Sequence, residues 1–223
     1  MKKAFYSILV LLVASLACNL GATPTTSGDS QLLFKDDFSS SNSGWDSIRD
    51  SNGITDYDNG GYRILVDTIG TQGNGMSYWA NPQLGTQLPA DLKVEVDAAK
   101  TAGPDDNEFG VVCRYNKTGE SYSFYEFMAT SDGYVGIILV KDGSQTVISG
   151  EKLDSFEGVK TGTATNRLRA DCIGENLTLY VNGQKAASAT DATLKTGDVG
   201  LIAGTFKEPG TDILFDNFLV TKP

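Results

Sequence analysis

The side chains that most often perform catalysis are sparse in this chain of 223 residues, which contains no histidine. Ser-His-Asp and Cys-His arrangements need an imidazole base, so these sites and histidine-ligated zinc sites are excluded. The 18 Lys and Arg residues are outnumbered by 28 Asp and Glu residues, which gives a formal charge of −10. Because nucleic-acid binding needs clustered cations that neutralise phosphates, we expect no nucleic-acid partner.

Cysteine is the next reactive side chain, and two of the three cysteines lie in strand-like runs. Cys113 is in phase with Val111, and Cys172 is in phase with Leu168 and Ala170, so both thiols should face a core. In an exported protein an even pair of this kind predicts a disulfide. Two buried free thiols are the alternative.

The remaining cysteine, Cys18, follows a segment typical of export. Two lysines precede an apolar run over residues 4–17, which is shorter than the roughly 20 residues that a membrane-spanning helix needs. Residues 1–17 are therefore predicted to be a signal peptide. The tetrapeptide Ser-Leu-Ala-Cys that ends at Cys18 resembles the bacterial lipobox. Ordinary cleavage, with Cys18 incidental, is the alternative.

The lipobox resemblance implies a lipidated Cys18 that anchors the exported protein to the outer face of a bacterial cell membrane. Residues 18–31 are rich in Ser, Thr, Pro and Gly and show no apolar periodicity, so they are predicted to be a flexible linker. Residues 32–223 show neither an internal linker nor a repeat, and are predicted to be one domain.

That domain shows β periodicity throughout, with no helix-length apolar stripe. The Asn-Gly and Asp-Gly pairs at positions 52, 59, 74, 132, 142 and 182 are typical of hairpin turns. Strands are predicted near 32–38, 62–66, 76–80, 92–98, 108–115, 121–130, 134–141, 145–153, 166–173, 176–181, 184–189, 199–204 and 213–220. So many short strands predict an all-β fold, a two-sheet antiparallel β-sandwich.

Several segments carry a family resemblance. They are KDDF with a following Gly-Trp pair, FGVVCRY, SYSFYEFMATSDGYVGI, NRLRADCIGENLTLYVNGQKAA, GDVGLIAG and LFDNFLV. Over residues 34–221 the chain resembles the concanavalin A-like lectin/glucanase jelly roll, in particular laminin-G-like modules and the 3-keto-disaccharide hydrolase domain family. The resemblance implies a jelly-roll sandwich, which hosts lectins, adhesion modules and glycosidases alike.

Related glucanases carry catalytic carboxylates as E-x-D-x-x-E on one strand. The nearest match here is Glu95-Val96-Asp97-Ala98-Ala99-Lys100, in which Lys100 replaces the second glutamate. Retaining hydrolysis is therefore not available from this motif, and Glu95 and Asp97 are predicted to be the polar outer face of a strand.

A polar surface patch is the candidate ligand site. Strand alternation predicts that Arg114, Glu126, Arg169, Asp171 and Tyr180 point outward, if Tyr125 packs inward. Aromatic faces stack on sugar C–H groups while charged groups bind hydroxyls, so this set suits carbohydrate. A network of ion pairs on a solvated sheet is the alternative.

A structural calcium ion is the one cofactor expected. The resemblance implies that the first and last strands pair, which would gather Asp36, Asp37, Asp212 and Asp216 into an oxygen-rich cluster. The alternative is that these carboxylates cap strand ends.

Three hypotheses for function follow. The first is a lipid-anchored, non-catalytic module that binds carbohydrate or another extracellular polymer. The second is a glycoside-acting hydrolase of the 3-keto-disaccharide type, and the third is a structural or protein-interaction module of the envelope.

Overall fold

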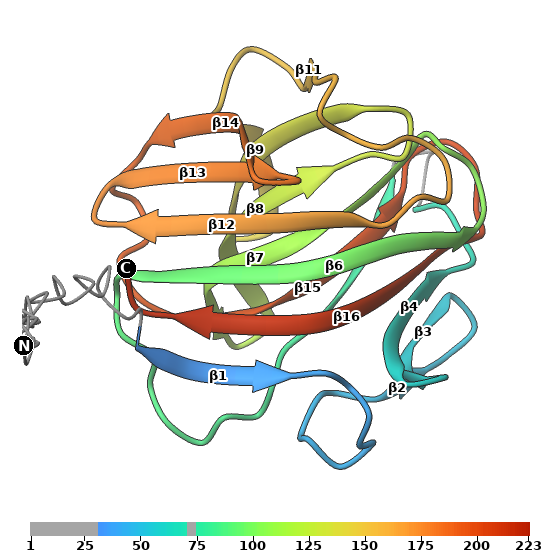
Figure 1. Cartoon of the computed structure of the whole chain (residues 1–223), viewed down its shortest axis with the longest axis horizontal. Helices are drawn as coiled ribbons and strands as arrows, with labels where there is room; N and C mark the ends of the chain where they lie inside the picture. The colour runs from blue at the N-terminus through green and yellow to red at the C-terminus, as the bar shows by residue number, and fades with distance from the viewer. Residues whose placement is uncertain (1–30, 71–74) are drawn as a thin grey trace, which may run out of the picture.

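A computed structural model describes residues 31–70 and 75–223, which fold as two antiparallel β-sheets packed face to face (Figure 1). The larger sheet has nine strands. Their spatial order is β14 (Gln184–Thr190), β13 (Asn176–Val181), β12 (Asn166–Ile173), β6 (Leu92–Ala102), β16 (Thr211–Thr221), β4 (Gly61–Val66), β3 (Gly53–Asp58) and β2 (Ile48–Arg49). The ninth strand, β1 (Leu32–Asp36), also pairs with β16.

The smaller sheet has seven strands. Their order is β10 (Ser144–Val147), β9 (Tyr134–Lys141), β8 (Ser121–Ala129), β7 (Asn107–Thr118), β15 (Asp198–Thr205) and β5 (Met76–Ala80), and β11 (Asp154–Ser155) pairs with β9. The part of the chain that the structure describes contains no helix, and therefore no helix that could cross a membrane. The predicted all-β, two-sheet antiparallel sandwich is confirmed.

Alternation of apolar and polar residues decides which face of each strand is buried. In β6, Leu92, Val94, Val96 and Ala98 are buried between the sheets, and the residues between them are partly exposed. The same period of two places Tyr125 and Phe127 of β8 in the inter-sheet core, which meets the condition on which the outward direction of Glu126 was predicted. Burial of these side chains is the main force that holds the sheets together.

Three of the predicted hairpin turns form with an Asn or Asp before glycine, and the one predicted at Asn74 lies outside the described residues. Asn59, Asp142 and Asn182 adopt φ values of 49°, 50° and 51°, a left-handed conformation that Asn and Asp tolerate better than most residues. Each turn joins two neighbouring antiparallel strands, β3 to β4, β9 to β10 and β13 to β14.

Two local predictions were wrong. The strand expected over 145–153 ends at Val147, after which the chain leaves the sheet and Leu153 packs on the outer face of the smaller sheet. Strands β2 and β3 were not predicted, because the Asp-rich segment 46–58 lacks a continuous apolar alternation.

The first and last strands pair, as the resemblance implied. Lys35 lies opposite Leu219 and Asp36 lies opposite Phe218, so β1 continues the sheet alongside the end of β16 (Figure 1).

Candidate functional site

The outer face of the smaller sheet is unusual because it is apolar, although no second sheet covers it. Its buried members form a separate outer-face cluster of Val112, Phe124, Met128, Ile138, Val140 and Ile202. Exposed or thinly covered apolar faces of this kind mark binding surfaces in soluble proteins.

Four aromatic rings extend this cluster toward one end of the sheet and form what we call the aromatic floor: Trp79, Tyr115, Tyr122 and Phe124. The ring centroids of Trp79 and Tyr122 are 4.5 Å apart, and those of Tyr122 and Phe124 are 6.0 Å apart with nearly parallel planes. Phe124 is buried, whereas the other three rings are partly exposed. The floor therefore offers ring faces to an incoming molecule.

A groove of about 1240 Å³ lies over the aromatic floor. One part of its lining is the connection over residues 81–87, and the rest includes Asn116 of β7, Gln145 of β10 and Asp198 of β15. Burial raises the pKa of Asp198 above its usual value. Groups that donate and accept hydrogen bonds thus surround an apolar floor, as in most sites for small organic ligands.

Asp46 holds the connection over residues 81–87 in place. Its carboxylate accepts a hydrogen bond from Nε2 of Gln83 at 3.0 Å, and the backbone N–H of Gln83 donates to the carbonyl of Gly44 at 2.8 Å. Trp45 forms a β-bridge with Pro82, and its buried ring plugs one end of the sandwich. The connection is therefore fixed to the core rather than free.

Two glutamates on the same sheet face lie buried beside the groove. Glu108 of β7 accepts a hydrogen bond from the hydroxyl of Ser77, a residue that lines the groove. Burial raises the pKa of Glu108 to about 7. Burial, together with the charge of Glu108, also raises the pKa of Glu126 well above its usual value.

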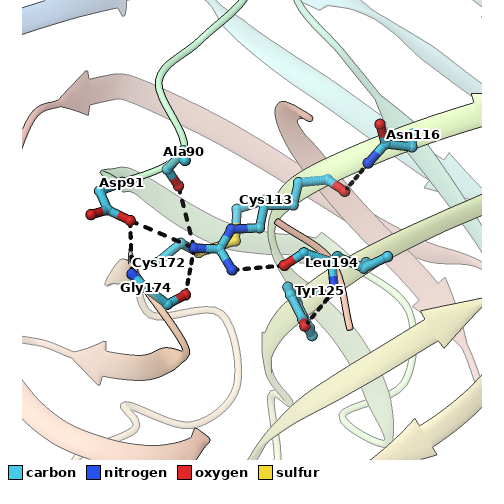
Figure 2. The surroundings of a disulfide bond; sticks show 9 residues. Ala90, Asp91, Cys113, Asn116, Tyr125, Cys172, Gly174 and Leu194 are labelled. Atoms are coloured by element: carbon cyan, nitrogen blue, oxygen red, sulfur yellow. Dashed lines mark hydrogen bonds and ion pairs between the residues drawn. A yellow bond between two sulfur atoms is a disulfide. The ribbon is translucent and has the colours of Figure 1, made fainter. Parts of the chain in front are cut away.

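The predicted ligand patch does not form, because its five residues lie in three places. Arg114 was expected on an outer face, but a bulge in β7 turns its side chain to the inner side, where it is 3% exposed. Its guanidinium donates to the carbonyl oxygens of Leu194 at 2.8 Å, Gly174 at 2.8 Å and Ala90 at 3.3 Å. Figure 2 shows these three residues around the disulfide.

Glu126 points outward as predicted, but from the smaller sheet. Arg169, Asp171 and Tyr180 lie together on the outer face of the larger sheet, on β12 and β13. The guanidinium of Arg169 lies 3.9 Å from the ring centroid of Tyr180, and its Nε is 2.9 Å from Oδ1 of Asp171. These three residues form an ion-pair and cation–π network on an open sheet.

The four aspartates expected to bind calcium do not converge either. Asp36 accepts from the indole N–H of Trp45 at 2.9 Å, and Asp212 forms a bidentate ion pair with Arg63 at 2.8 Å. The remaining two, Asp37 and Asp216, accept hydrogen bonds from nearby backbone N–H groups. Within residues 31–70 and 75–223, no three Asp, Glu, Cys or His side chains are grouped to hold a metal ion.

The incomplete glucanase motif lies away from the groove. Glu95 and Asp97 are on the outer face of the larger sheet, where both pair with Arg167. Lys100 is buried and forms an ion pair with Asp105. The strand prediction for this segment is therefore confirmed.

The Cys113–Cys172 disulfide is confirmed, and it joins β7 of the smaller sheet to β12 of the larger one. Cys18 and the predicted signal peptide lie outside the described residues.

The aromatic floor is what the sequence reasoning missed. None of its four rings was among the predicted site residues. The signal was available: Tyr122, Phe124 and Glu126 alternate along one strand, so both rings share the outward face that was assigned to the glutamate.

Comparison with known proteins finds similarity in structure alone. No family model matches the sequence, and no curated protein matches it. A carbohydrate binding module, CBM66 from Bacillus subtilis, is 14% identical with a TM-score of 0.61, covering 81% of this chain and 96% of that one. A Bacillus licheniformis beta-glucanase is 13% identical with a TM-score of 0.61, covering 85% and 98%.

The catalytic domain of an endo-1,3-beta-glucanase from Thermotoga petrophila is 11% identical with a TM-score of 0.57, covering 87% of this chain and 98% of that domain. The structural neighbours thus include both a carbohydrate-binding module and glycoside hydrolases. Their coverage of both chains, together with the two-sheet topology, shows that this chain has the concanavalin A-like lectin/glucanase jelly-roll fold.

Proposed function

We propose that the groove over the aromatic floor binds carbohydrate and that the protein is a non-catalytic glycan-binding module. The observation that carries the proposal is the pair of partly exposed rings of Trp79 and Tyr122, 4.5 Å apart on the floor of the groove. Pyranose rings present C–H faces that pack on aromatic rings, and their hydroxyls need polar partners.

The groove supplies those partners. Gln83, Asn116, Gln145 and Asp198 all line the groove. Amide side chains both donate and accept hydrogen bonds, as sugar hydroxyls do. The groove is therefore matched to a neutral polyhydroxylated ligand rather than to an anion.

Two carboxylates line the groove among the described residues, Asp46 and Asp198, and the Asp46 carboxylate is already held by hydrogen bonds from Gln83 and from the backbone N–H of Asn81. Glu108 and Glu126 do not line it, and the Glu95 and Asp97 carboxylates lie on the other sheet. Glycoside hydrolysis by two carboxyl groups needs both beside the scissile bond. This arrangement supports binding over turnover.

The test is affinity electrophoresis and calorimetric titration of residues 28–223 against soluble β-glucans, xylan and fructan. Trp79→Ala removes a stacking ring worth about 1–1.5 kcal/mol and should weaken binding roughly tenfold. Tyr180→Ala is the matched control, because it removes an aromatic ring from the opposite sheet and should leave binding unchanged.

Equal weakening by both substitutions, or none by Trp79→Ala, would move the site away from the groove. Release of reducing sugar from any of these polymers would instead support the hydrolase hypothesis. The predicted lipid anchor at Cys18 would hold this groove at the surface of the cell.

A further inference from the structure

Glu108 and Glu126 are buried on a sheet face that consists mainly of apolar side chains. Glu126 is 1% exposed and Glu108 is 4% exposed. Val112 of β7 and Ile138 of β9 lie directly opposite Glu126, and Phe124 and Met128 flank it along β8. A carboxylate in such surroundings is strongly destabilised when it carries charge.

The two carboxyl groups have almost no partners. Oε1 of Glu126 is buried and accepts no hydrogen bond in the described part of the chain, and Glu108 accepts one from the hydroxyl of Ser77. A side chain at Gly204 would collide with both Glu108 and Ser77, so the glycine leaves room for this contact. One hydroxyl donor cannot compensate two buried negative charges.

In the described part of the chain, the strands that flank the pair present no cation to it, and the segment that packs Leu153 on this face carries three exposed charged side chains, Glu151, Lys152 and Asp154. The neighbouring strands β5, β9 and β15 present Ser77, Ile138 and Gly204 to this face. Lys207, in the connection between β15 and β16, forms an ion pair at 2.9 Å with Asp106, which lies in the turn before β7. Neither glutamate takes part in an ion pair among residues 31–70 and 75–223.

We propose that Glu108 and Glu126 form a proton-binding site beside the aromatic floor, which keeps the floor packed while the carboxyls are protonated and loosens it as they become charged. The two glutamates lie on the same face of the adjacent strands β7 and β8, and the charge of Glu108 contributes to the raised pKa of Glu126. The inference does not depend on which ligand the groove binds.

Strands β5 and β8 each connect the site to the floor over a short distance in the sequence. Ser77, the partner of Glu108, is two residues from Trp79 on the same face of β5. Glu126 is two residues from Phe124 on the same face of β8, and the centroids of Phe124 and Trp79 are 6.0 Å apart. Repulsion within the pair therefore acts on both sides of the same aromatic contact.

The direction of the pH effect follows from the pKa values. Burial raises the pKa of Glu108 from 4.5 to about 7, so the folded state holds a proton that the unfolded chain has already lost. The stabilising effect of this proton is complete below about pH 4.5 and is lost as the pH rises through about 7. Alkaline conditions therefore weaken the floor.

The experiment compares thermal unfolding and tryptophan fluorescence at about pH 5 and about pH 8 for four proteins. They are the wild type, Glu126→Gln, Glu108→Gln and Glu175→Gln, the last being a control that removes an exposed charge from a turn. We expect the melting temperature of the wild type and the control to fall by roughly 5–10 °C with rising pH. The melting temperatures of Glu126→Gln and Glu108→Gln should fall by less than half as much.

Fluorescence reports on the floor itself, since Trp79 and Trp45 are the only tryptophans. The wild-type spectrum should change between the two pH values in the folded protein, and Trp79→Phe and Glu126→Gln should each remove that change. Equal pH dependence of melting in Glu126→Gln and wild type would overturn the proton site. A pH-dependent melting temperature with a constant Trp79 signal would overturn its coupling to the floor.

Discussion

Replacing Arg114 with methionine should destabilise the protein far more than replacing an exposed arginine. The buried guanidinium donates three hydrogen bonds to backbone carbonyls in three separate connections, those of Ala90, Gly174 and Leu194 (Figure 2). Methionine fills much of the same volume but donates nothing, so all three carbonyls lose their charged partner.

The size of the effect can be worked out from these contacts. A hydrogen bond from a charged donor contributes about 1.5 kcal/mol at the low end of the measured range, and three give about 4–5 kcal/mol. The ion pair with Asp91 adds little, because its N–O distance is 3.8 Å and the Asp91 side chain is 50% exposed. For a domain of this size, we expect the melting temperature to fall by roughly 10 °C or more.

Urea unfolding under non-reducing conditions, followed by circular dichroism, measures the free energy of unfolding. Arg49→Met is the matched control, because its side chain is 67% exposed and its N–O distance to Asp56 is 3.9 Å. The control should cost about 0.5 kcal/mol or less. A loss below about 1 kcal/mol for Arg114→Met, with an unchanged denaturant slope, would refute the reasoning.

Two further predictions concern the cysteines. The disulfide joins residues 59 positions apart, so Cys113→Ala with Cys172→Ala should lower the free energy of unfolding by about 4 kcal/mol in urea, and equal stability would contradict this loop-closure argument. Cys18→Ser should release the protein from the membrane fraction of a bacterial host into the soluble fraction, whereas unchanged fractionation would disprove the predicted lipid anchor.

Strand alternation predicted the inner faces of the sheets well, because burial between two sheets demands apolar residues at every second position. Cys113 and Cys172 were correctly placed facing the core for this reason, and their disulfide is confirmed. For residues 121–130 the same reasoning left the inward face open, and the structure places Tyr125 inward and Glu126 outward.

Alternation of apolar and polar residues does not indicate where a strand departs from its period of two. Between Cys113 and Asn116 the register shifts, and Arg114 takes a φ of 55°, so the side chain changes face. The local sequence does not indicate the bulge. The carbonyl groups that Arg114 contacts there come from three connections that are distant in the sequence.

Nor does alternation say which sheet a strand joins. Glu126 and Arg169 both face outward, but from opposite sides of the sandwich, so they cannot share a ligand. The aromatic floor required the pairing of β5 with β15, residues separated by more than a hundred positions in the chain.

The position of β16 has a consequence for biosynthesis. Among the described strands, it alone connects the half of the larger sheet that contains β6 with the half that contains β4. Residues 211–221 are synthesised after the other described strands, so the two halves cannot be joined through β16 until these residues have emerged, and the halves then close across a long loop. A nascent chain that is still incomplete at this point exposes two unpaired sheet edges. A chaperone would prevent these edges from pairing with the edges of other nascent chains.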